Sequence, residues 1–387
     1  MFAAVEAYSR FGVHHTGKEP DRLTSDWQAN HLVQLGFEVH RQEFGIEQFD
    51  AEEVSLVLED GARIAAAPQY PVAISGGPLT ARLAAANEAA ADLDGAIAIV
   101  ELETGNTIDL PDQMSALARV WERGAVAIVA ICKHPSGRIQ FGNVADDRER
   151  WRIPLALVGG ADRERLLAAV GSRATFRLEG KHRSVVGQNV QGRLVRGDEW
   201  IVVSTPQSGW TTCAGERGPG IAYFRALAEW ASVLEGGPSW LFTSNSGHEF
   251  HDLGARTAQQ AGTLPLPGKT ALWLHLGAGI AQRSWVEHDA GITLVDEKAR
   301  TLLSCDWSDS FSMLRQFWGT RTFIVPHQLL KLGEMREIVS HGYETVLGLV
   351  SEQPYHHVPG DLPETTSPQI LETMGRAILS AISGYVR

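Results

Sequence analysis

The chain has 387 residues, which is enough for one large domain that carries an insertion. Apolar residues make up 44% and charged residues 21% of the sequence, as in an ordinary folded protein. The formal net charge of −12 argues against a nucleic acid or an anionic membrane surface as the partner.

Cysteine usage and the N-terminus bear on the compartment. Cys132, Cys213 and Cys305 lie far apart and in no metal-type spacing, so we expect reduced thiols in a cytoplasmic protein. Residues 1–15 lack a charged stretch followed by a long apolar one, so no signal peptide is expected. No run of about 18 apolar residues occurs, and the sequence therefore predicts no membrane-spanning helix.

The first predicted elements are a helix and a strand. "DRLTSDWQANHLVQLGFEVHRQEF" (21–44) predicts a helix with Thr24 or Ser25 as its N-cap and Gly36 just after its end. The alternating segment 37–44 then predicts a strand. A helix that leads into a strand is typical of the start of an α/β fold.

Residues 52–185 differ from the preceding segment in their pattern of predicted strands and helices. "VSLVLEDGARIAA" (54–66) predicts a hairpin with Asp60-Gly61 at its turn. Short apolar strands then alternate with two helices, near 114–125 and 162–170. This pattern predicts a smaller inserted α/β domain over 52–185, so that 1–51 and 186–387 form the main domain.

The main domain is predicted to be a three-layer α/β sandwich. Strands at "WIVVSTP", "SWLFTSNS", "TALWLHLGA", "RTFIVPHQ" and "ETVLGLVSE" alternate with loops and helices, which predicts a mixed, mostly parallel sheet with helices on both faces. The closing helix is equally suited to the core or to an interface in a homo-oligomer. Its apolar face consists of Ile370, Met374, Ala377, Ile378 and Ile382.

Polar residues follow the strands at the positions where such sheets bind ligands. Ligands of open α/β sheets bind outside the carboxyl ends of the strands. A single histidine after a strand is usually a loop residue without a role, but four successive strand ends carry acids or histidines here. Imidazole and carboxylate are the usual ligands of catalytic zinc, so these residues predict a metal site. They are Glu216, His248, Glu249, His275, His356, His357 and Asp361.

These segments resemble the M28 family of zinc aminopeptidases along nearly the whole chain. Residues 15–39 are similar to that family's opening helix and strand, and 52–185 resemble its protease-associated insertion. "WIVVSTPQSG" resembles the strand that ends in a His-x-Asp motif, and "CAGERGPG" the glycine-rich loop with the bridging Asp. The later segments resemble the Glu-Glu, Asp and His-Thr-Pro-x-Asp motifs; they are "WLFTSNSGHEF", "LWLHLGAG" and "PYHHVPGD".

The chain departs from the family at its metal ligands. Pro206 and Ser208 stand at the His and Asp of the first motif, and proline has no side-chain donor atom. The other family positions carry Glu216 for the bridging Asp, His248 for the general-base Glu, Glu249 for the ligand Glu, His275 for the second Asp and His357 for the last His.

The resemblance therefore implies one zinc ion or none. Glu216, Glu249 and His357 would hold it, as in the one-zinc acid–acid–His site of the glutaminyl cyclases, which are similar in fold. His275 would be a fourth ligand or a hydrogen-bonding partner, and Asp361 would orient His357. On an extended segment neighbouring side chains point in opposite directions, and the spacing to Asp361 selects His357 over His356.

The remaining candidates concern the substrate. His248 has an ordinary pKa of about 6.5, so it would accept a proton near neutral pH. Arg217 would anchor an acidic group of the substrate, stand in for a missing metal, or form a salt bridge with Glu216. Ser208, Trp210 and Cys213 would line the pocket, and Cys213 is a nucleophile only if its thiol is acidified. His327, after "FIVP", is an outside candidate for the site.

Three functions remain open from the sequence. The first is a metal-dependent hydrolase of an amide or peptide-like bond, acting on a small molecule or a short peptide-like substrate. The second is a metal-free pseudo-peptidase that serves as a binding protein. The third is an enzyme of altered chemistry, such as a cyclase, lyase or transferase, that uses His248, His275 and Arg217 directly.

Overall fold

A computed structural model of the chain describes residues 1–72, 74–87, 91–103, 117, 119–143, 152–289, 291–296, 302–304, 322–324 and 333–386. Its main feature is an eleven-stranded sheet in the order β1-β2-β6-β5-β4-β3-β7-β9-β8-β10-β15. The strands are β1 Glu38–Leu58, β2 Arg63–Pro68, β3 Gly76–Ala85, β4 Ile97–Leu102, β5 Ala127–Cys132, β6 Leu155–Gly159, β7 Arg173–Leu194, β8 Trp200–Pro206, β9 Ser239–Asn245, β10 Thr270–Leu276 and β15 Val346–Leu349.

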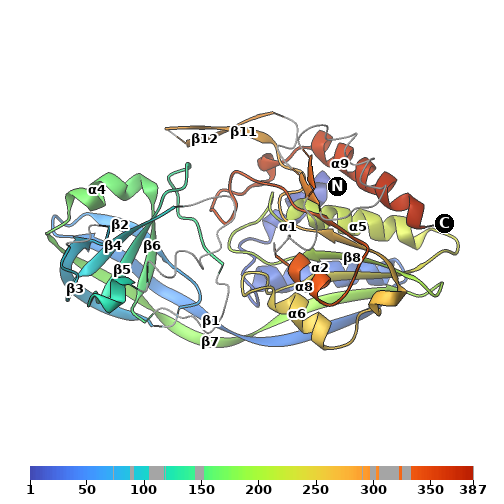
Figure 1. Ribbon diagram of the computed structural model, residues 1–387, viewed down its shortest axis with the longest axis horizontal. Coiled ribbons are helices and arrows are strands. Elements are labelled where there is room, and N and C mark those ends of the chain that lie inside the picture. The colour runs from blue at the N-terminus through green and yellow to red at the C-terminus, as the bar shows by residue number, and fades with distance from the viewer. Residues whose placement is uncertain are drawn as a thin grey trace.

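Two long antiparallel strands, β1 and β7, run through both halves of the molecule (Figure 1). In the smaller half the pairings close on themselves, because β1, β2, β6, β5, β4, β3 and β7 form a ring in which β7 pairs with β1 again. The core inside this ring includes Leu83, Val129 and Phe176. The helix α4 (Arg163–Ala168) packs against the ring through Leu166.

The predicted limits of the inserted domain fall inside these two strands. The limit at 51/52 coincides with a break in the register of β1 against β7, between Ala51 and Glu53. The limit at 185/186 lies within β7, where Val186 pairs with Gly45. The strands continue across both positions, so two paired strands connect the halves.

The larger half is a three-layer sandwich, as predicted. The strands β9, β8, β10 and β15 are parallel, whereas β7 is antiparallel to β9. One face packs against helices that share a core with it: α1 Phe2–Arg10, α2 Glu19–Gln34, α5 Gly218–Ser232 and α9 Pro368–Ile382. The other face packs against α8 Met335–Ser340 and, next to it, α6 Leu253–Gln260. Two small sheets pair β11 Ser284–His288 with β12 Gly291–Asp296, and β13 Leu302–Ser304 with β14 Thr322–Ile324.

Local predictions were confirmed at two elements and wrong at a third. Leu56 pairs with Ile64 across the predicted hairpin, and Gly61 has φ +88° at its turn. The predicted apolar face of α9 is buried in the chain's own core. The helix α2 begins at Glu19, five residues before the predicted cap Thr24, because Pro20 suits its first turn and the Thr24 hydroxyl donates back to the Pro20 carbonyl.

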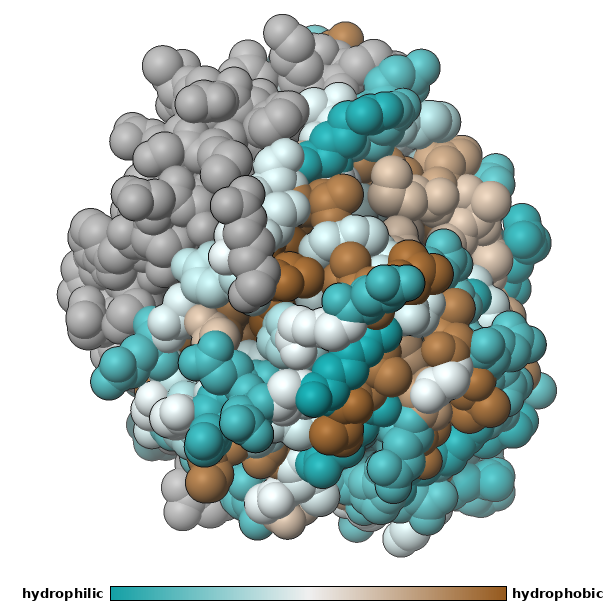
Figure 2. Space-filling model, turned by 90° about the vertical axis from the view of Figure 1, so that its right-hand side faces the viewer, coloured by the Kyte–Doolittle hydropathy of each residue, from teal (hydrophilic) through white to brown (hydrophobic). Residues whose placement is uncertain are grey.

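The end of the molecule remote from the smaller half has a mixed surface. Figure 2 shows this end, where apolar side chains in brown lie between polar ones in teal and white. Exposed large apolar residues in the described chain include Val195, Val233 and Leu266, in the segments that precede β8, β9 and β10. Scattered apolar residues of this kind are normal on a protein surface. Among the helices that the structure describes, none is both long and apolar enough to cross a membrane.

The parallel strands end together, and this positions the candidate site. Pro206 at the end of β8 pairs with Asn245 at the end of β9, and Leu276 of β10 pairs with Leu349 of β15. The segments after these ends therefore meet at one edge of the sheet.

Candidate functional site

The backbone is strained in the segments that follow the strand ends. Among the described non-glycine residues, positive φ angles occur at Cys213 (50°), His251 (55°), Asp252 (57°) and His357 (60°). All four lie after β8, β9 or β15. The left-handed conformation costs an ordinary residue about 1–2 kcal/mol, and such strain gathers at functional sites. The strained residues point to this edge of the sheet as the functional one.

Asp361 fixes the loop that presents Glu216. Its Oδ1 accepts a hydrogen bond from the Gly215 amide, and its Oδ2 accepts one from the Glu216 amide, both at 2.8 Å. Burial and the nearby Glu216 charge raise the pKa of Asp361 to about 7. Asp361 thus holds the backbone of a candidate ligand. The histidine that it was expected to orient, His357, bonds elsewhere: its Nδ1 lies 3.1 Å from the Phe141 carbonyl oxygen.

His356 and His357 lie side by side and both face Glu216. Their rings stack with centroids 3.9 Å apart and an angle of 24° between the planes. The prediction that the two point in opposite directions is wrong, because the left-handed backbone at His357 replaces the extended one assumed. His357 Nε2 lies 3.5 Å from Glu216 Oε1, and His356 Nδ1 lies 3.9 Å from the same oxygen.

These three residues could hold a metal ion. One ligand atom from each of Glu216, His356 and His357 lies within 4.8 Å of the others. Neither carboxylate oxygen of the fully buried Glu216 has a hydrogen-bond partner. One carboxylate and two imidazoles form a three-residue donor set of the kind that binds catalytic zinc with an open position. The residues present therefore fit a single metal.

Their protonation states also suit a metal. Burial raises the pKa of Glu216, but Arg217 and the two histidines lower it more, so the pKa lies well below its ordinary value. Burial, together with the neighbouring His357, holds the pKa of His356 well below its usual range. An ionised carboxylate and a neutral imidazole are the forms that bind metals.

Arg217 lies beside Glu216 and is almost completely buried. Its Nη2 is 2.8 Å from Glu216 Oε1, although this nitrogen makes no hydrogen bond of good geometry. Its Nε donates to the Ser208 carbonyl at 3.1 Å. Burial lowers the pKa of Arg217, but Glu216 together with Cys213, Tyr8 and Glu334 outweighs burial and raises the pKa, so the guanidinium stays charged. Of the roles considered for Arg217, the salt bridge with Glu216 is the contact present.

Glu249 lies in a hydrogen-bonded pocket of its own. Its Oε1 accepts from the Thr16 amide at 3.2 Å. Its Oε2 accepts from the Thr16 hydroxyl at 3.0 Å and from the Ser208 hydroxyl at 2.5 Å. Glu249 is not in the three-residue group of Glu216, His356 and His357. Ser208, at the family's Asp position, therefore serves as a donor to Glu249.

His248 is held between two acids. Its Nδ1 lies 3.1 Å from Asp252 Oδ1 and 3.9 Å from Glu334 Oε1. Burial and the Arg217 charge lower the pKa of His248, but Asp252 and Glu334 outweigh them and raise it to about 9. At neutral pH His248 is thus protonated, and it can donate a proton but cannot accept one. The expectation that it accepts a proton near pH 7 rested on an ordinary pKa.

His275 is a neutral residue of the buried sheet. Its Nδ1 lies 2.9 Å from the Ser204 hydroxyl, which also accepts a hydrogen bond from Trp273 Nε1 at 2.8 Å. Burial lowers the pKa of His275 to about 4. Its side chain is therefore uncharged, with one ring nitrogen bonded within the β8–β10 pair.

Trp210 and Cys213 are buried. Trp210 is 2% exposed; it stacks on Tyr70 and Phe141 of the smaller half, and its Nε1 donates to Asn143 Oδ1 at 2.6 Å. It thus fills the junction between the halves. Burial and the Glu216 charge raise the pKa of Cys213 well above its ordinary value, so its thiol is not activated as a nucleophile. Cys305 and His327 lie outside the described residues.

Three contributors to the site carry no clear sequence signal. Glu334 is buried, and its Oε2 accepts from Asn245 Nδ2 at 3.0 Å. In the sequence Glu334 is an ordinary acid before a helix. Only the structure shows that it is buried, which is rare for an acid. Thr16 lies in "HHTGKE", which has no strand-end setting. Phe141 acts through its backbone carbonyl, which no side-chain pattern reveals.

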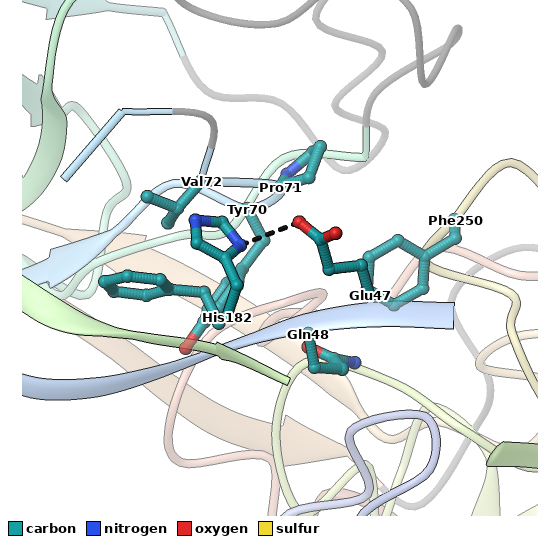
Figure 3. Close-up of a pocket in the computed structure, with 8 residues that line it drawn as sticks. Glu47, Gln48, Tyr70, Pro71, Val72, His182 and Phe250 are labelled. Carbon is teal, nitrogen blue, oxygen red and sulfur yellow. Dashed lines mark ion pairs between the residues drawn. The ribbon is translucent and has the colours of Figure 1, made fainter. Parts of the chain in front are cut away.

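A small cavity lies at the junction of the two halves, beside the site segment 246–252. Figure 3 shows Tyr70, Pro71 and Val72 on one side, Phe250 on another, and the ion pair between His182 Nδ1 and Glu47 Oε1 at 2.9 Å. It has room for about one water molecule. The cavity is too small to be a peptide-binding cleft.

Comparison with solved structures places this geometry in a known architecture. The chain is similar to a zinc aminopeptidase from Bacillus subtilis, with a TM-score of 0.78, 16% identity and coverage of 100% of this chain and 94% of that one. It is similar to a peptidase M28 precursor from Shewanella amazonensis, with a TM-score of 0.72, 15% identity and coverage of 98% and 92%. A glutaminyl cyclase from Porphyromonas gingivalis aligns with a TM-score of 0.51, 9% identity and coverage of 99% and 96%.

No protein-family profile and no curated protein sequence matches the chain. At identities of 9–16% the structural alignments establish the fold and leave the activity open. The chain therefore has the α/β sandwich fold of the M28-like zinc aminopeptidases, the fold that its sequence resemblance implied.

Proposed function

We propose that the chain is a hydrolase of amide or peptide-like bonds that uses one metal ion, held by Glu216, His356 and His357. The observation that carries this proposal is the Glu216 carboxylate. It is ionised and fully buried, it has no hydrogen bond to either oxygen, and it faces two imidazole rings. Arg217 is a charged neighbour of this carboxylate, but it forms no hydrogen bond of good geometry with either oxygen. Buried polar atoms without hydrogen bonds are costly, and a divalent ion would bind these oxygens directly.

The residues of the site suit amide hydrolysis. A metal bound here would acidify a water molecule and polarise the substrate carbonyl. Arg217, next to Glu216 Oε1, can bind a developing oxyanion or a substrate carboxylate. His248, protonated at neutral pH, can donate a proton to the leaving amine, and its Nδ1 lies 3.1 Å from Asp252 Oδ1.

Two further candidate ligands would have to rearrange. Glu249 would give up its bonds to Thr16 and Ser208, and His275 would have to turn from Ser204 or use its other nitrogen. We therefore assign Glu249 to the support of the site and His275 to the sheet beneath it. A small molecule or a short peptide-like compound is the proposed substrate, and the net charge of −12 argues against a nucleic acid.

A second candidate follows from the Arg217–Glu216 contact. A guanidinium 2.8 Å from Glu216 already supplies a positive charge, which favours a metal-free binding protein on the same fold. A third candidate, an enzyme of altered chemistry such as a cyclase, draws support from the similarity to a glutaminyl cyclase and from the protonated His248.

Metal binding separates these candidates. The protein, purified without added metal, is analysed for zinc, manganese and cobalt and is then titrated with each. We expect one ion per chain, lost in Glu216→Gln and in His357→Ala and retained in His182→Ala, an exposed histidine outside the site. Absence of binding to the wild-type chain would refute the hydrolase proposal.

Activity then completes the test. The metal-loaded protein is screened against a panel of aminoacyl and peptidyl amides, with His248→Gln compared with the wild type. We expect turnover that depends on the metal and falls by about 10²–10⁴-fold in the variant, the usual range for a general acid. Turnover that is equal with and without metal would favour the third candidate.

A further inference from the structure

The smaller half contributes a segment to the candidate metal site. Residues 138–143 follow β5 and lie against the turn 356–359 of the larger half. Four hydrogen bonds join the two segments: Gln140 Nε2 to the His356 carbonyl (2.8 Å), the Phe141 amide to the His357 carbonyl (3.0 Å), His357 Nδ1 to the Phe141 carbonyl (3.1 Å) and Arg138 Nη1 to the Pro359 carbonyl (2.7 Å).

The bond at His357 fixes the tautomer of its ring. A carbonyl oxygen only accepts, so His357 Nδ1 carries the hydrogen in this contact. In the neutral ring Nε2 is then unprotonated, and Nε2 is the atom that lies 3.5 Å from Glu216. A histidine ligand commonly donates its other ring N–H to a carbonyl or carboxylate in this way. The bond to Phe141 therefore leaves the lone pair of His357 Nε2, on the side of Glu216, available to a metal ion.

The other bonds hold a strained backbone in place. His357 has φ +60°, a conformation that an ordinary residue leaves unless its surroundings prevent this. Gln140 holds the carbonyl before this residue, and the Phe141 amide holds the carbonyl of the residue itself. This same backbone conformation brings the ring of His356 onto that of His357.

The segment 138–143 is itself anchored in the smaller half. The amide of Gly142 donates to Gln69 Oε1 at 3.1 Å, and Gln69 Nε2 donates to the Gly142 carbonyl at 2.8 Å. Asn143 accepts the bond from Trp210. The segment is therefore fixed to the ring of strands on one side and to the histidine turn on the other.

We propose that the segment 138–143 of the smaller half positions the metal ligands, with Phe141 setting the tautomer of His357 and Gln140 and Arg138 holding the turn that stacks His356 on it. This inference deepens the proposed function and rests on it. Simple packing between halves would use the same contacts, but it would stabilise the fold without changing the affinity of the site or the tautomer of one ring.

The experiment compares Gln140→Leu, Arg138→Met and their double variant with the wild type. Lys133→Met is the matched control, since Lys133 also follows β5 but pairs with Glu101 and Glu103. Zinc affinity is measured by competition with a chromophoric chelator, and thermal unfolding reports on folding. Nitrogen-15 spectra of labelled histidine in the metal-free protein report the tautomer, with the His357 signal assigned from His357→Gln.

We expect zinc to bind about 10–100-fold more weakly in the double variant, the usual effect of losing partners that orient ligands. Lys133→Met should bind as the wild type does. In the metal-free spectra the His357 signal should show a hydrogen on Nδ1 in the wild type and averaging over both nitrogens in the double variant. Unchanged affinity and an unchanged His357 signal in a folded double variant would overturn the inference.

The two proposals fail in different ways. If the wild type binds no metal while the His357 signal still responds to the double substitution, the hydrolase proposal fails and the positioning role stands. If the wild type binds metal and neither readout responds in the variants, the positioning role fails and the metal site stands.

Discussion

The guanidinium of Arg217 and the carboxylate of Glu216 lie 2.8 Å apart, and their side chains are 1% and 0% exposed. The two residues are neighbours in the sequence at the N-terminus of α5, where the helix dipole favours negative charge. The same oxygen of Glu216 faces His356 and His357. A fixed cation and a candidate metal site therefore share one buried carboxylate.

Arg217→Met should destabilise the metal-free protein and increase the stabilisation that zinc binding gives. Breaking a buried ion pair costs about 3–5 kcal/mol, because the remaining charge has no partner. Loss of a nearby positive charge should also tighten zinc binding by about tenfold. Urea unfolding with and without zinc measures both effects. Arg376→Met on the surface of α9 removes the same charge far from the site and should change neither. Equal stabilisation by zinc in Arg217→Met and the wild type would show that Arg217 and the metal do not compete.

Glu249→Gln should keep the metal site and lose stability. The hydroxyls of Ser208 and Thr16 can still bond to an amide, but hydrogen bonds to a charged group are lost, at a cost of about 1–3 kcal/mol. Zinc affinity should change by less than about threefold, whereas Glu216→Gln, its matched counterpart, should abolish binding. If instead zinc binding disappears in Glu249→Gln, Glu249 is a ligand and the ligand set implied by the family resemblance holds.

Gly215→Ala should damage the site through crowding. A Cβ atom at residue 215 would lie 2.6 Å from Asp361 Oδ1 and from Gln282 Nε2, and closer still to the Thr365 hydroxyl. The Asp361 carboxylate would have to release the loop amides that it binds, which moves Glu216. We expect a loss of about 1–3 kcal/mol in the free energy of unfolding and at least tenfold weaker zinc binding.

Gly45→Ala is the control for that substitution. Gly45 lies in β1, and a Cβ atom there would have no neighbour within 4 Å. Metal affinity and folding should both remain as in the wild type. Normal zinc affinity in Gly215→Ala would mean that the position of Glu216 does not depend on Asp361.

Asp21→Asn should change how stability depends on pH. Asp21 accepts bonds from the Gly17 amide, Gln207 and Ser246, yet burial outweighs them and raises its pKa to about 7. In the unfolded chain Asp21 loses its proton near pH 4, whereas in the folded protein it keeps the proton until about pH 7. Its contribution to stability therefore falls as the pH rises from about 4 to 7 and is constant above that.

The variant isolates this contribution, because asparagine resembles the protonated acid and does not titrate. Between pH 4 and pH 7 the wild type should lose up to about 4 kcal/mol of unfolding free energy relative to Asp21→Asn. Urea unfolding at several pH values measures it. A difference that does not vary with pH would mean that Asp21 is ionised throughout.

The sequence predicted the layers and the edge of the sheet where the site lies. Alternation of strands and helices led to the sandwich, and the rule for strand ends led to Glu216 and His357, whose side chains lie 3.5 Å apart. This prediction succeeded because the alternation of apolar and polar residues in the sequence marks where each strand ends.

Directions of side chains could not be predicted in the same way. The choice of His357 over His356 assumed an extended backbone, and a single left-handed residue turns both rings toward Glu216. The role of His248 assumed an ordinary pKa, and two carboxylates from Asp252 and Glu334 change its charge state. Such contacts depend on shifts of a few ångströms between segments distant in sequence, and no local pattern encodes them.

The unbroken passage of β1 and β7 through both halves has a practical consequence. An insertion connected by loops can be spliced out and its ends rejoined, but removal of residues 52–185 would sever two strands that pair with each other on both sides of the cut. A smaller half taken from a related protein would have to continue both strands with the same residue pairing between β1 and β7. Exchange of the smaller half would therefore alter the larger half as well.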